Sequence, residues 1–238
     1  MSTFVVWDCE TDTALPRGTG ALERDLAIER SEVTVLCCLV FDSGDLLLPT
    51  GNWKEARDKA VAHTFWRDAA EIGEGPFDGA LALFDAADAI VAYNGFGFDL
   101  RVLSKYYASS KLGSRRRLMH RLKLLDPMIR IAQALDTRFP GLDDLLRING
   151  LKGKSSNGIE AIRMWERGER GELEKYCMDD VEALSKLVFL PTLKVAGGAV
   201  LPNAVHGVAS FVMAQRAIAP APADGGWTIV EPSEALAA

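Results

Sequence analysis

Residues 4–10 read Phe-Val-Val-Trp-Asp-Cys-Glu, a run of strand-forming apolar residues that ends in acids. Such a run predicts a buried central strand. Side chains two positions apart point to the same face of a strand, so Asp8 and Glu10 project together and Cys9 points the opposite way. Crowded carboxylates repel each other unless a cation lies between them, and hard divalent cations prefer oxygen ligands. The stretch therefore predicts a metal site at a strand end, although acidic pairs at strand ends commonly cap or face solvent.

The sequence that follows predicts two more strands. Residues 11–29 contain a proline and two glycines and are expected to form a loop, and the apolar run over 33–41 predicts the second strand. Residues 42–45, Asp-Ser-Gly-Asp, predict a turn, and Leu46–Leu48 a short third strand. Together the three strands are expected to form an antiparallel meander.

The rest of the chain alternates between strands and helices. Further strands are expected at 89–93 and 122–125, helices at 77–86, at 99–107, from Pro127 onward and over most of 141–188, and a helical or irregular segment at 53–70. This order predicts an α/β fold. Its mixed five-stranded sheet has three antiparallel strands followed by two parallel ones, flanked by helices.

Two further segments place acids at defined positions. Asp99 follows the turn Asn94-Gly95-Phe96-Gly97, at a strand-to-helix junction that could line a ligand-binding crevice; a helix N-cap explains an Asp there about as well. Tyr176 and Asp180 are four positions apart and share one helical face, whereas Asp179 points elsewhere. Taken alone, an amphipathic helix with surface acids explains that pair better.

Together these three features resemble the DEDD superfamily of 3'-5' exonucleases, in its tyrosine-bearing (DEDDy) branch. The matching positions are Asp8 and Glu10 (Asp-x-Glu), Asn94, Phe98 and Asp99 (Asn-xxx-Phe-Asp), and Tyr176 and Asp180 (Tyr-xxx-Asp). The histidine-bearing branch has its base at the position that Lys175 occupies here. A weaker similarity over 142–187 resembles the proofreading exonuclease domain of family B DNA polymerases, but no polymerase domain follows.

The resemblance implies a ribonuclease H-like fold and a site for two divalent ions, Mg²⁺ or Mn²⁺. Asp8 would bridge the ions, Glu10 and Asp180 would complete one site, and Asp99 would hold the second. Tyr176 would position the attacking water. The implied reaction removes nucleotides from the 3' end of a single strand, DNA favoured over RNA, and releases nucleoside 5'-monophosphates.

Substrate contacts are expected from two parts of the chain. The backbone around Thr11, together with Asn94, would contact the terminal nucleotide, and Phe96 would stack on a base, although a buried loop aromatic is as good an explanation of Phe96. The net charge is -6, yet residues 111–123 carry a basic run without acids that includes Arg115, Arg116 and Arg117. Beside an acidic metal site this run would contact phosphate; otherwise it is a solvated loop.

Composition sets the remaining expectations. The four cysteines show no metal-binding spacing, so they are expected to be buried and reduced. No apolar run is long enough for a membrane span, and no secretory signal is visible. We therefore expect an intracellular protein, cytoplasmic or nucleoid-associated, away from membranes, with a polymerase or another replication or repair protein as a potential partner. Residues 1–190 are expected to form the exonuclease domain and 191–238 an extension, with a flexible Ala/Pro/Gly linker at 219–226.

Two alternatives keep the same fold. One is a non-catalytic module that binds nucleic acid as a scaffold, and the other is a related endonuclease. The complete set of four carboxylates argues against the first. The position of Tyr176 argues against the second.

Overall fold

The computed structural model describes residues 3–16, 20–42, 44, 52–69, 75–107, 113–135, 140–153 and 158–203. Within these residues five strands form one mixed sheet in the order β3-β2-β1-β4-β5. The strands are β1 (Thr3–Thr11), β2 (Val33–Asp42), β3 (Val61–Trp66), β4 (Ala89–Val91) and β5 (Leu124–Leu125). β1 pairs antiparallel with β2 and β2 with β3, whereas β4 is parallel to both β1 and β5. The predicted α/β, ribonuclease H-like arrangement is confirmed.

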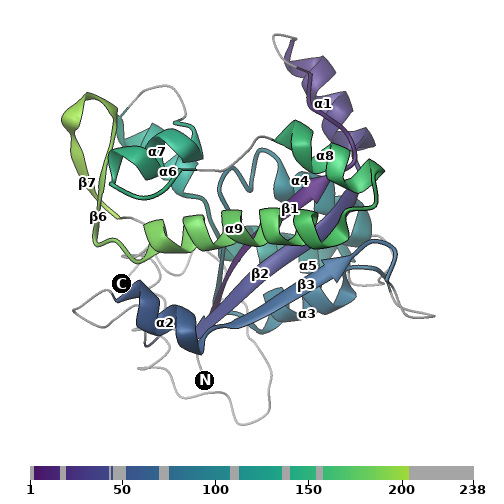
Figure 1. The fold of residues 1–238 in the computed structure, drawn as a ribbon, viewed down its shortest axis with the longest axis horizontal. Helices are drawn as coiled ribbons and strands as arrows, with labels where there is room; N and C mark the ends of the chain where they lie inside the picture. The colour runs from purple at the N-terminus through teal and green to yellow at the C-terminus, as the bar shows by residue number, and fades with distance from the viewer. Residues whose placement is uncertain are drawn as a thin grey trace, which may run out of the picture.

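Helices cover both faces of this sheet (Figure 1). One face packs against α2 (Trp53–Lys59), α8 (Gly158–Glu166) and the long α9 (Arg170–Val188). The other packs against α1 (Ala21–Arg30), α3 (Asp78–Ala86), α4 (Asp99–Leu103) and the 3-10 turn η2 (Ser104–Tyr107), with α5 (Gly113–Lys123) packed on α3. Within the described residues, every helix is too short or too polar to cross a membrane.

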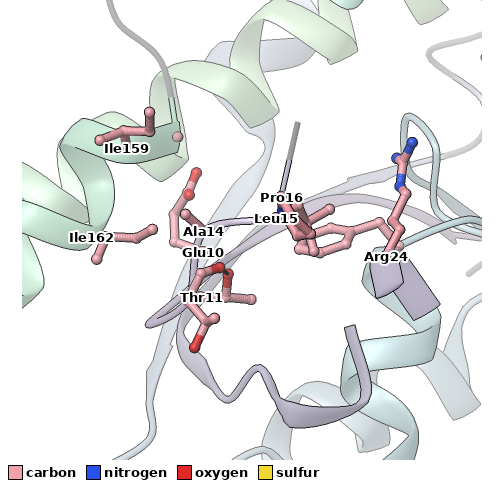
Figure 2. Close-up of a pocket in the computed structure, with 11 residues that line it drawn as sticks. Glu10, Thr11, Ala14, Leu15, Pro16, Arg24, Ile159 and Ile162 are labelled. Atoms are coloured by element: carbon pink, nitrogen blue, oxygen red, sulfur yellow. Dashed lines mark hydrogen bonds between the residues drawn. The ribbon is translucent and has the colours of Figure 1, made fainter. Parts of the chain in front are cut away.

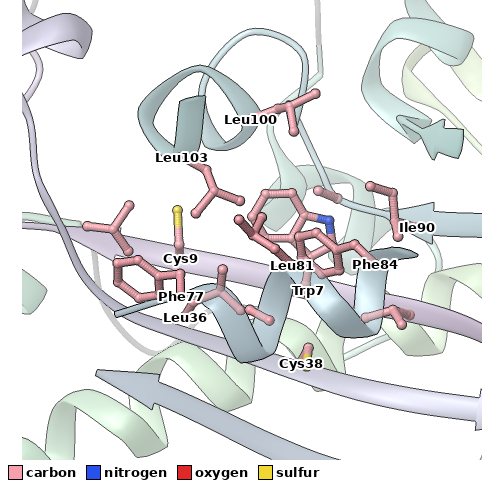
Figure 3. Close-up of a cluster of buried hydrophobic side chains, with 14 of the residues drawn as sticks. Trp7, Cys9, Leu36, Cys38, Phe77, Leu81, Phe84, Ile90, Leu100 and Leu103 are labelled. Carbon is pink, nitrogen blue, oxygen red and sulfur yellow. The ribbon is translucent and has the colours of Figure 1, made fainter. Parts of the chain in front are cut away.

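The central strand β1 is the strand that the sequence predicts. Its alternate residues enter two separate cores: Phe4 and Val6 pack toward α9, whereas Trp7 and Cys9 pack toward α3 and α4. Figure 3 shows Trp7 and Cys9 in the second core, surrounded by apolar side chains of both helices. Because a strand alternates with a period of two, Asp8 and Glu10 continue the row that faces α9.

Three local predictions were wrong. The segment expected to be a loop over 11–29 contains helix α1, because Ala21–Arg30 is rich in helix formers and buries only Ile28, too few positions to give a periodic signal. The third strand of the sheet is β3, in a segment expected to be helical or irregular; as a half-exposed edge strand it lacks a clear alternation. The predicted strand Leu46–Leu48 lies outside the described residues. The basic run expected to be a loop is mostly helix α5.

A smaller body adjoins the end of α9. Helices α6 (Pro127–Leu135) and α7 (Leu142–Ile148) meet a hairpin of β6 (Thr192–Lys194) and β7 (Val200–Pro202), joined through the short turn η3 (Ala196–Gly198). Leu193 and Val195 are buried there against Leu145, Leu146 and Leu187. The boundary expected at residue 190 stays a prediction. The expected linker at 219–226 lies outside the described residues.

Candidate active site

The end of β1 carries the first pair of acids. Asp8 and Glu10 are half-buried and lie on the face that α9 covers. The register with β2 shifts between Glu10 and Thr11, which marks a β-bulge. The Thr34 hydroxyl donates to the Glu10 carbonyl at 3.1 Å across this irregularity. A bulge bends and twists the strand locally, so it directs the residues after Glu10 away from the sheet edge.

Helix α9 brings the third motif to this strand end. The Cys177 thiol donates to the Asp8 carbonyl at 3.5 Å. One ligand atom each from Asp8, Glu10 and Cys177 lie within 4.8 Å of one another, a spacing that could hold a metal ion. Burial raises the pKa of Cys177 well above its ordinary value, so its sulfur is a neutral thiol at neutral pH. The carboxylate oxygens are therefore the charged donors of this cluster.

Tyr176 and Asp180 lie on the buried side of α9, with 6% and 4% of their surface exposed. Asp179 lies on the opposite side, where it accepts from Lys175 at 2.7 Å in an exposed ion pair. The prediction that Tyr176 and Asp180 share a helical face while Asp179 points elsewhere is thus confirmed. The exposed Lys175 is engaged with Asp179.

Asp99 reaches the same strand end from the opposite layer. It is the first residue of α4, is 3% exposed, and its Oδ1 accepts from the Cys9 thiol at 3.4 Å. Burial raises the pKa of Asp99 to about 6, partly offset by the Cys9 hydrogen bond and increased by the charge of Asp126. Asp99 thus contacts the Cys9 side chain on one face of β1, whereas Cys177 of α9 lies beside Asp8 and Glu10 on the other face.

Asp126 is a buried acid that sequence reasoning missed. Its Oδ1 accepts the backbone N–H groups of Asn94 and Met128 at 3.0 and 3.1 Å, and its Oδ2 accepts that of Phe96 at 3.2 Å. Asp126 therefore fastens the turn before Asp99 to the start of α6. The signal was present in the sequence as Asp126-Pro127, since an Asp before Pro commonly begins a helix.

The turn before α4 restricts its own residues. Asn94 has φ 62°, a left-handed conformation that Asn tolerates better than most residues. A Cβ at Gly97 would lie 2.3 Å from the Asn94 side-chain oxygen, and one at Gly95 would lie 2.8 Å from the Ala92 Cβ. This close packing explains both glycines. It also gives Asn94 a structural reason that is independent of any substrate contact.

A pocket of about 540 Å³ opens beside Glu10. Figure 2 shows it between α8 and α1, with Ile159 and Ile162 on one side and Arg24 on the other. Thr11, Leu15, Pro16 and Phe98 also line it. Thr11 and Glu10 are thus the predicted site residues that the pocket includes. Its walls are mainly apolar, with one acid and one base among the lining residues.

The other predicted substrate contacts lie outside this pocket lining. Phe96 is half-buried, with the Arg121 guanidinium 5.7 Å from its ring centre. Arg115, Arg116 and Arg117 lie on α5, which packs against α3 in the layer opposite α9. Arg116 pairs with Asp85 of α3 at 2.7 Å. The structure therefore does not bring this basic run to the acids of β1.

Four buried thiols complete the description of the site and its surroundings. Cys9, Cys37, Cys38 and Cys177 are all free and buried, as predicted. Burial raises the pKa of Cys9 well above its ordinary value, helped by the charges of Asp99, Asp8 and Glu10. Cys9 and Cys177, which contact Asp99 and Asp8, are therefore neutral thiols.

No protein-family model and no curated protein matches the chain. Among solved structures, it is similar to E. coli exonuclease I in complex with an oligonucleotide, with a TM-score of 0.37 and 15% sequence identity. That similarity covers 74% of this chain and 42% of the exonuclease I chain, less than half of its length. So distant a likeness carries no argument about activity. A functional conclusion for this chain therefore depends on its own residues: Asp8 and Glu10 at the end of the central strand lie beside Cys177 of α9, and Asp99 of α4 contacts Cys9 of the same strand.

Proposed function

We propose that the protein is a metal-dependent 3'-5' exonuclease of the tyrosine-bearing DEDD type, acting on a single-stranded 3' end, with DNA favoured over RNA. One observation carries the proposal. Asp8 and Glu10 cluster with α9 at Cys177, and Asp99 contacts the Cys9 thiol on the opposite face of the same strand end. This supports the proposal, because the three segments that carry the family motifs, β1, the start of α4 and the middle of α9, contact one another at the end of β1.

The donor chemistry fits Mg²⁺ or Mn²⁺. Asp8, Glu10, Asp99 and Asp180 offer only carboxylate oxygens, the ligands that hard cations prefer. The neighbouring Cys177 is a neutral thiol and does not add a soft anionic ligand. Asp8, Glu10 and Asp180 would hold one ion, and Asp99 with Asp8 the second. Two bound ions would stabilise the charge that develops on the attacking and leaving oxygens of a phosphoryl displacement.

The chain's own groups would perform the remaining tasks. The Tyr176 hydroxyl, on the same helical face as Asp180, would orient the attacking water. The apolar pocket walls would hold the nucleoside and exclude bulk water, while Thr11 at the pocket edge and Asn94 in the neighbouring turn would contact the terminal nucleotide. Hydrolysis from the 3' end would release nucleoside 5'-monophosphates. A polymerase or another replication or repair protein is the partner we propose.

The test compares two adjacent acids on α9. We expect Asp180→Asn to abolish degradation of end-labelled DNA in Mg²⁺ or Mn²⁺, because one metal ligand is lost. Asp179→Asn is the matched control: it is next in sequence but lies outside, paired with Lys175, so activity should stay near that of the unsubstituted protein. A ladder that shortens from the 3' side is the expected product pattern.

Other outcomes separate the alternatives. Internal cuts would identify an endonuclease, and tight binding without cleavage a scaffold module. Equal activity of the Asp180→Asn and Asp179→Asn variants would refute the site. Parallel RNA and double-stranded substrates test the proposed preference for single-stranded DNA.

A further inference from the structure

The pocket beside Glu10 has a definite order of chemistry along its length. Glu10 lies on the side near α8, and Arg24 of α1 lies across the pocket from it (Figure 2). Between them lie the apolar side chains of Leu15 and Pro16, and Ile159 and Ile162 of α8 line the wall beyond Glu10. Among the pocket-lining residues, Arg24 is the one cation. The pocket thus offers a carboxylate, then apolar side chains, then a guanidinium, and its ligand should carry groups of complementary charge and polarity in the same order.

The Arg24 side chain is exposed at the edge of the pocket. It lies one helical turn before Ile28, the one buried residue of α1. The helix is fastened to α4 by the ion pair between Arg101 and Asp25 at 2.7 Å. Among the described residues, the Arg24 side chain forms no ion pair or hydrogen bond, whereas Arg67 near the same strand end pairs with Asp12 at 2.7 Å.

An unpaired arginine beside a pocket is suited to phosphate, because its planar donors match phosphate oxygens. A nucleic acid strand repeats phosphate, nucleoside and phosphate, which is the order that the pocket accommodates if the scissile phosphate lies at the acids. The volume is within the range of small-ligand pockets. The apolar walls suit a base and sugar, since stacking on apolar and aromatic side chains tolerates any base.

We propose that Arg24 binds the second phosphate of the substrate, the one across a single nucleoside from the scissile phosphate. The proposal rests on the exonuclease function proposed above. Two groups share this chemistry: the next phosphodiester along the strand, and a phosphate monoester on the 3' end. Arg24 is thus a residue that determines substrate specificity and lies outside the metal site.

The loss of one charge-assisted contact should raise the KM for the oligonucleotide about ten-fold. It should also reduce the slope of log affinity against log salt by about 0.7, as expected when one phosphate contact to a single strand is lost. Arg24→Lys keeps the charge without the planar fork and should recover part of the loss. Arg30→Ala is the matched control, because Arg30 is an exposed arginine of the same helix that does not line the pocket.

The experiment measures kcat and KM of the full chain and the Arg24→Ala, Arg24→Lys and Arg30→Ala variants on three substrates. These are an oligonucleotide with a 3'-hydroxyl, the same oligonucleotide with a 3'-phosphate, and thymidine 5'-p-nitrophenyl phosphate, which has a single phosphodiester. For Arg24→Ala, we expect the fall in kcat/KM on one of the two oligonucleotides to be about ten-fold larger than its fall on the single diester. A loss on the 3'-hydroxyl form identifies the next phosphodiester, and a loss confined to the 3'-phosphate form identifies the monoester.

Two results would overturn the proposal. One is an Arg24→Ala variant that matches Arg30→Ala on both oligonucleotides. The other is an equal loss on all three substrates, which would place Arg24 in a role that does not depend on a second phosphate. Absence of cleavage of every substrate by the unsubstituted protein would instead refute the exonuclease function itself.

Discussion

Asp99 combines deep burial with a position at the proposed metal site. Its pKa is raised to about 6 chiefly by burial, whereas in the unfolded chain the carboxyl titrates near 4. The folded state therefore holds this proton to higher pH than the unfolded state does. It follows that the free energy of unfolding falls as pH rises from about 4 to about 6, and stays lower above that window.

The Asp99→Asn variant should lack this pH-dependent loss, because an amide does not ionise. With metal ions removed by a chelator, we expect the melting temperature of the variant to exceed that of the unsubstituted protein at about pH 7.5. At about pH 4 the two melting temperatures should be similar. Thermal unfolding at both pH values measures the difference. An equal difference in melting temperature between the two proteins at both pH values would show that Asp99 does not titrate in this window.

Asp126 acts on Asp99 through the backbone. It accepts three backbone N–H groups, two of them in the turn that leads to Asp99. Asp126→Ala leaves these donors without their acceptor, so we expect the free energy of unfolding to fall by about 2 kcal/mol or more in urea titrations. Asp126→Asn retains one oxygen and should lose less stability. If kcat of that variant falls while its KM changes little, Asp126 positions Asp99 through the turn. Unchanged kcat and KM would show that Asp126 contributes to stability alone.

At the scale of elements, α9 does two different things along its length. Its middle contacts the end of β1 through Cys177 and carries Tyr176 and Asp180 on its buried side, and Asn203, which follows β7, caps its C-terminus. The buried Asn203 amide donates to the carbonyls of Leu187 and Leu190, both at 2.7 Å. The last carbonyls of a helix lack partners within it, so an external donor stabilises this end.

We expect Asn203→Ala to lower the free energy of unfolding by about 1–3 kcal/mol, because carbonyls near the end of a helix lose their donor. Asn203→Asp should cost more, since a carboxylate of the same shape faces carbonyl oxygens. Urea unfolding measures both. Nuclease activity per folded molecule serves as the control and should be retained, because the hairpin lies on the opposite side of the fold from α1 and α8, the helices that line the pocket (Figure 1). Equal stability of all three proteins would contradict the capping role.

At the scale of the whole molecule, the net charge of -6 includes the acids that gather at one strand end. A ligand that binds only the folded state stabilises it by about 2.7 kcal/mol at a hundred-fold excess over Kd. For a chain of this size we expect Mn²⁺ to raise the melting temperature by about 5–10 °C. Asp180→Asn should abolish the shift and Asp179→Asn should keep it. A similar shift in both variants would place the ion elsewhere.

The sequence by itself determined the central strand β1, the strands β2, β4 and β5, the mixed character of the sheet, and the segments that carry the acids. These features are local: the apolar run before Asp8, the glycine-bearing turn before Asp99 and the four-residue spacing of Tyr176 and Asp180 depend only on strand and helix geometry. Helix α1 and strand β3 escaped prediction because each is largely exposed. An element that buries few residues leaves little hydrophobic pattern.

Only the tertiary structure decided which side chains meet. It joined Asp99 to Cys9, Cys177 to Asp8, and Asp126 to the turn before Asp99, and it placed the basic run of α5 in the layer opposite α9. It also set Arg24 across a pocket from Glu10. These contacts join residues that are distant in sequence, and they depend on how helices pack on the two faces of the sheet. Local patterns cannot specify them, because packing is a property of facing surfaces and not of either surface alone.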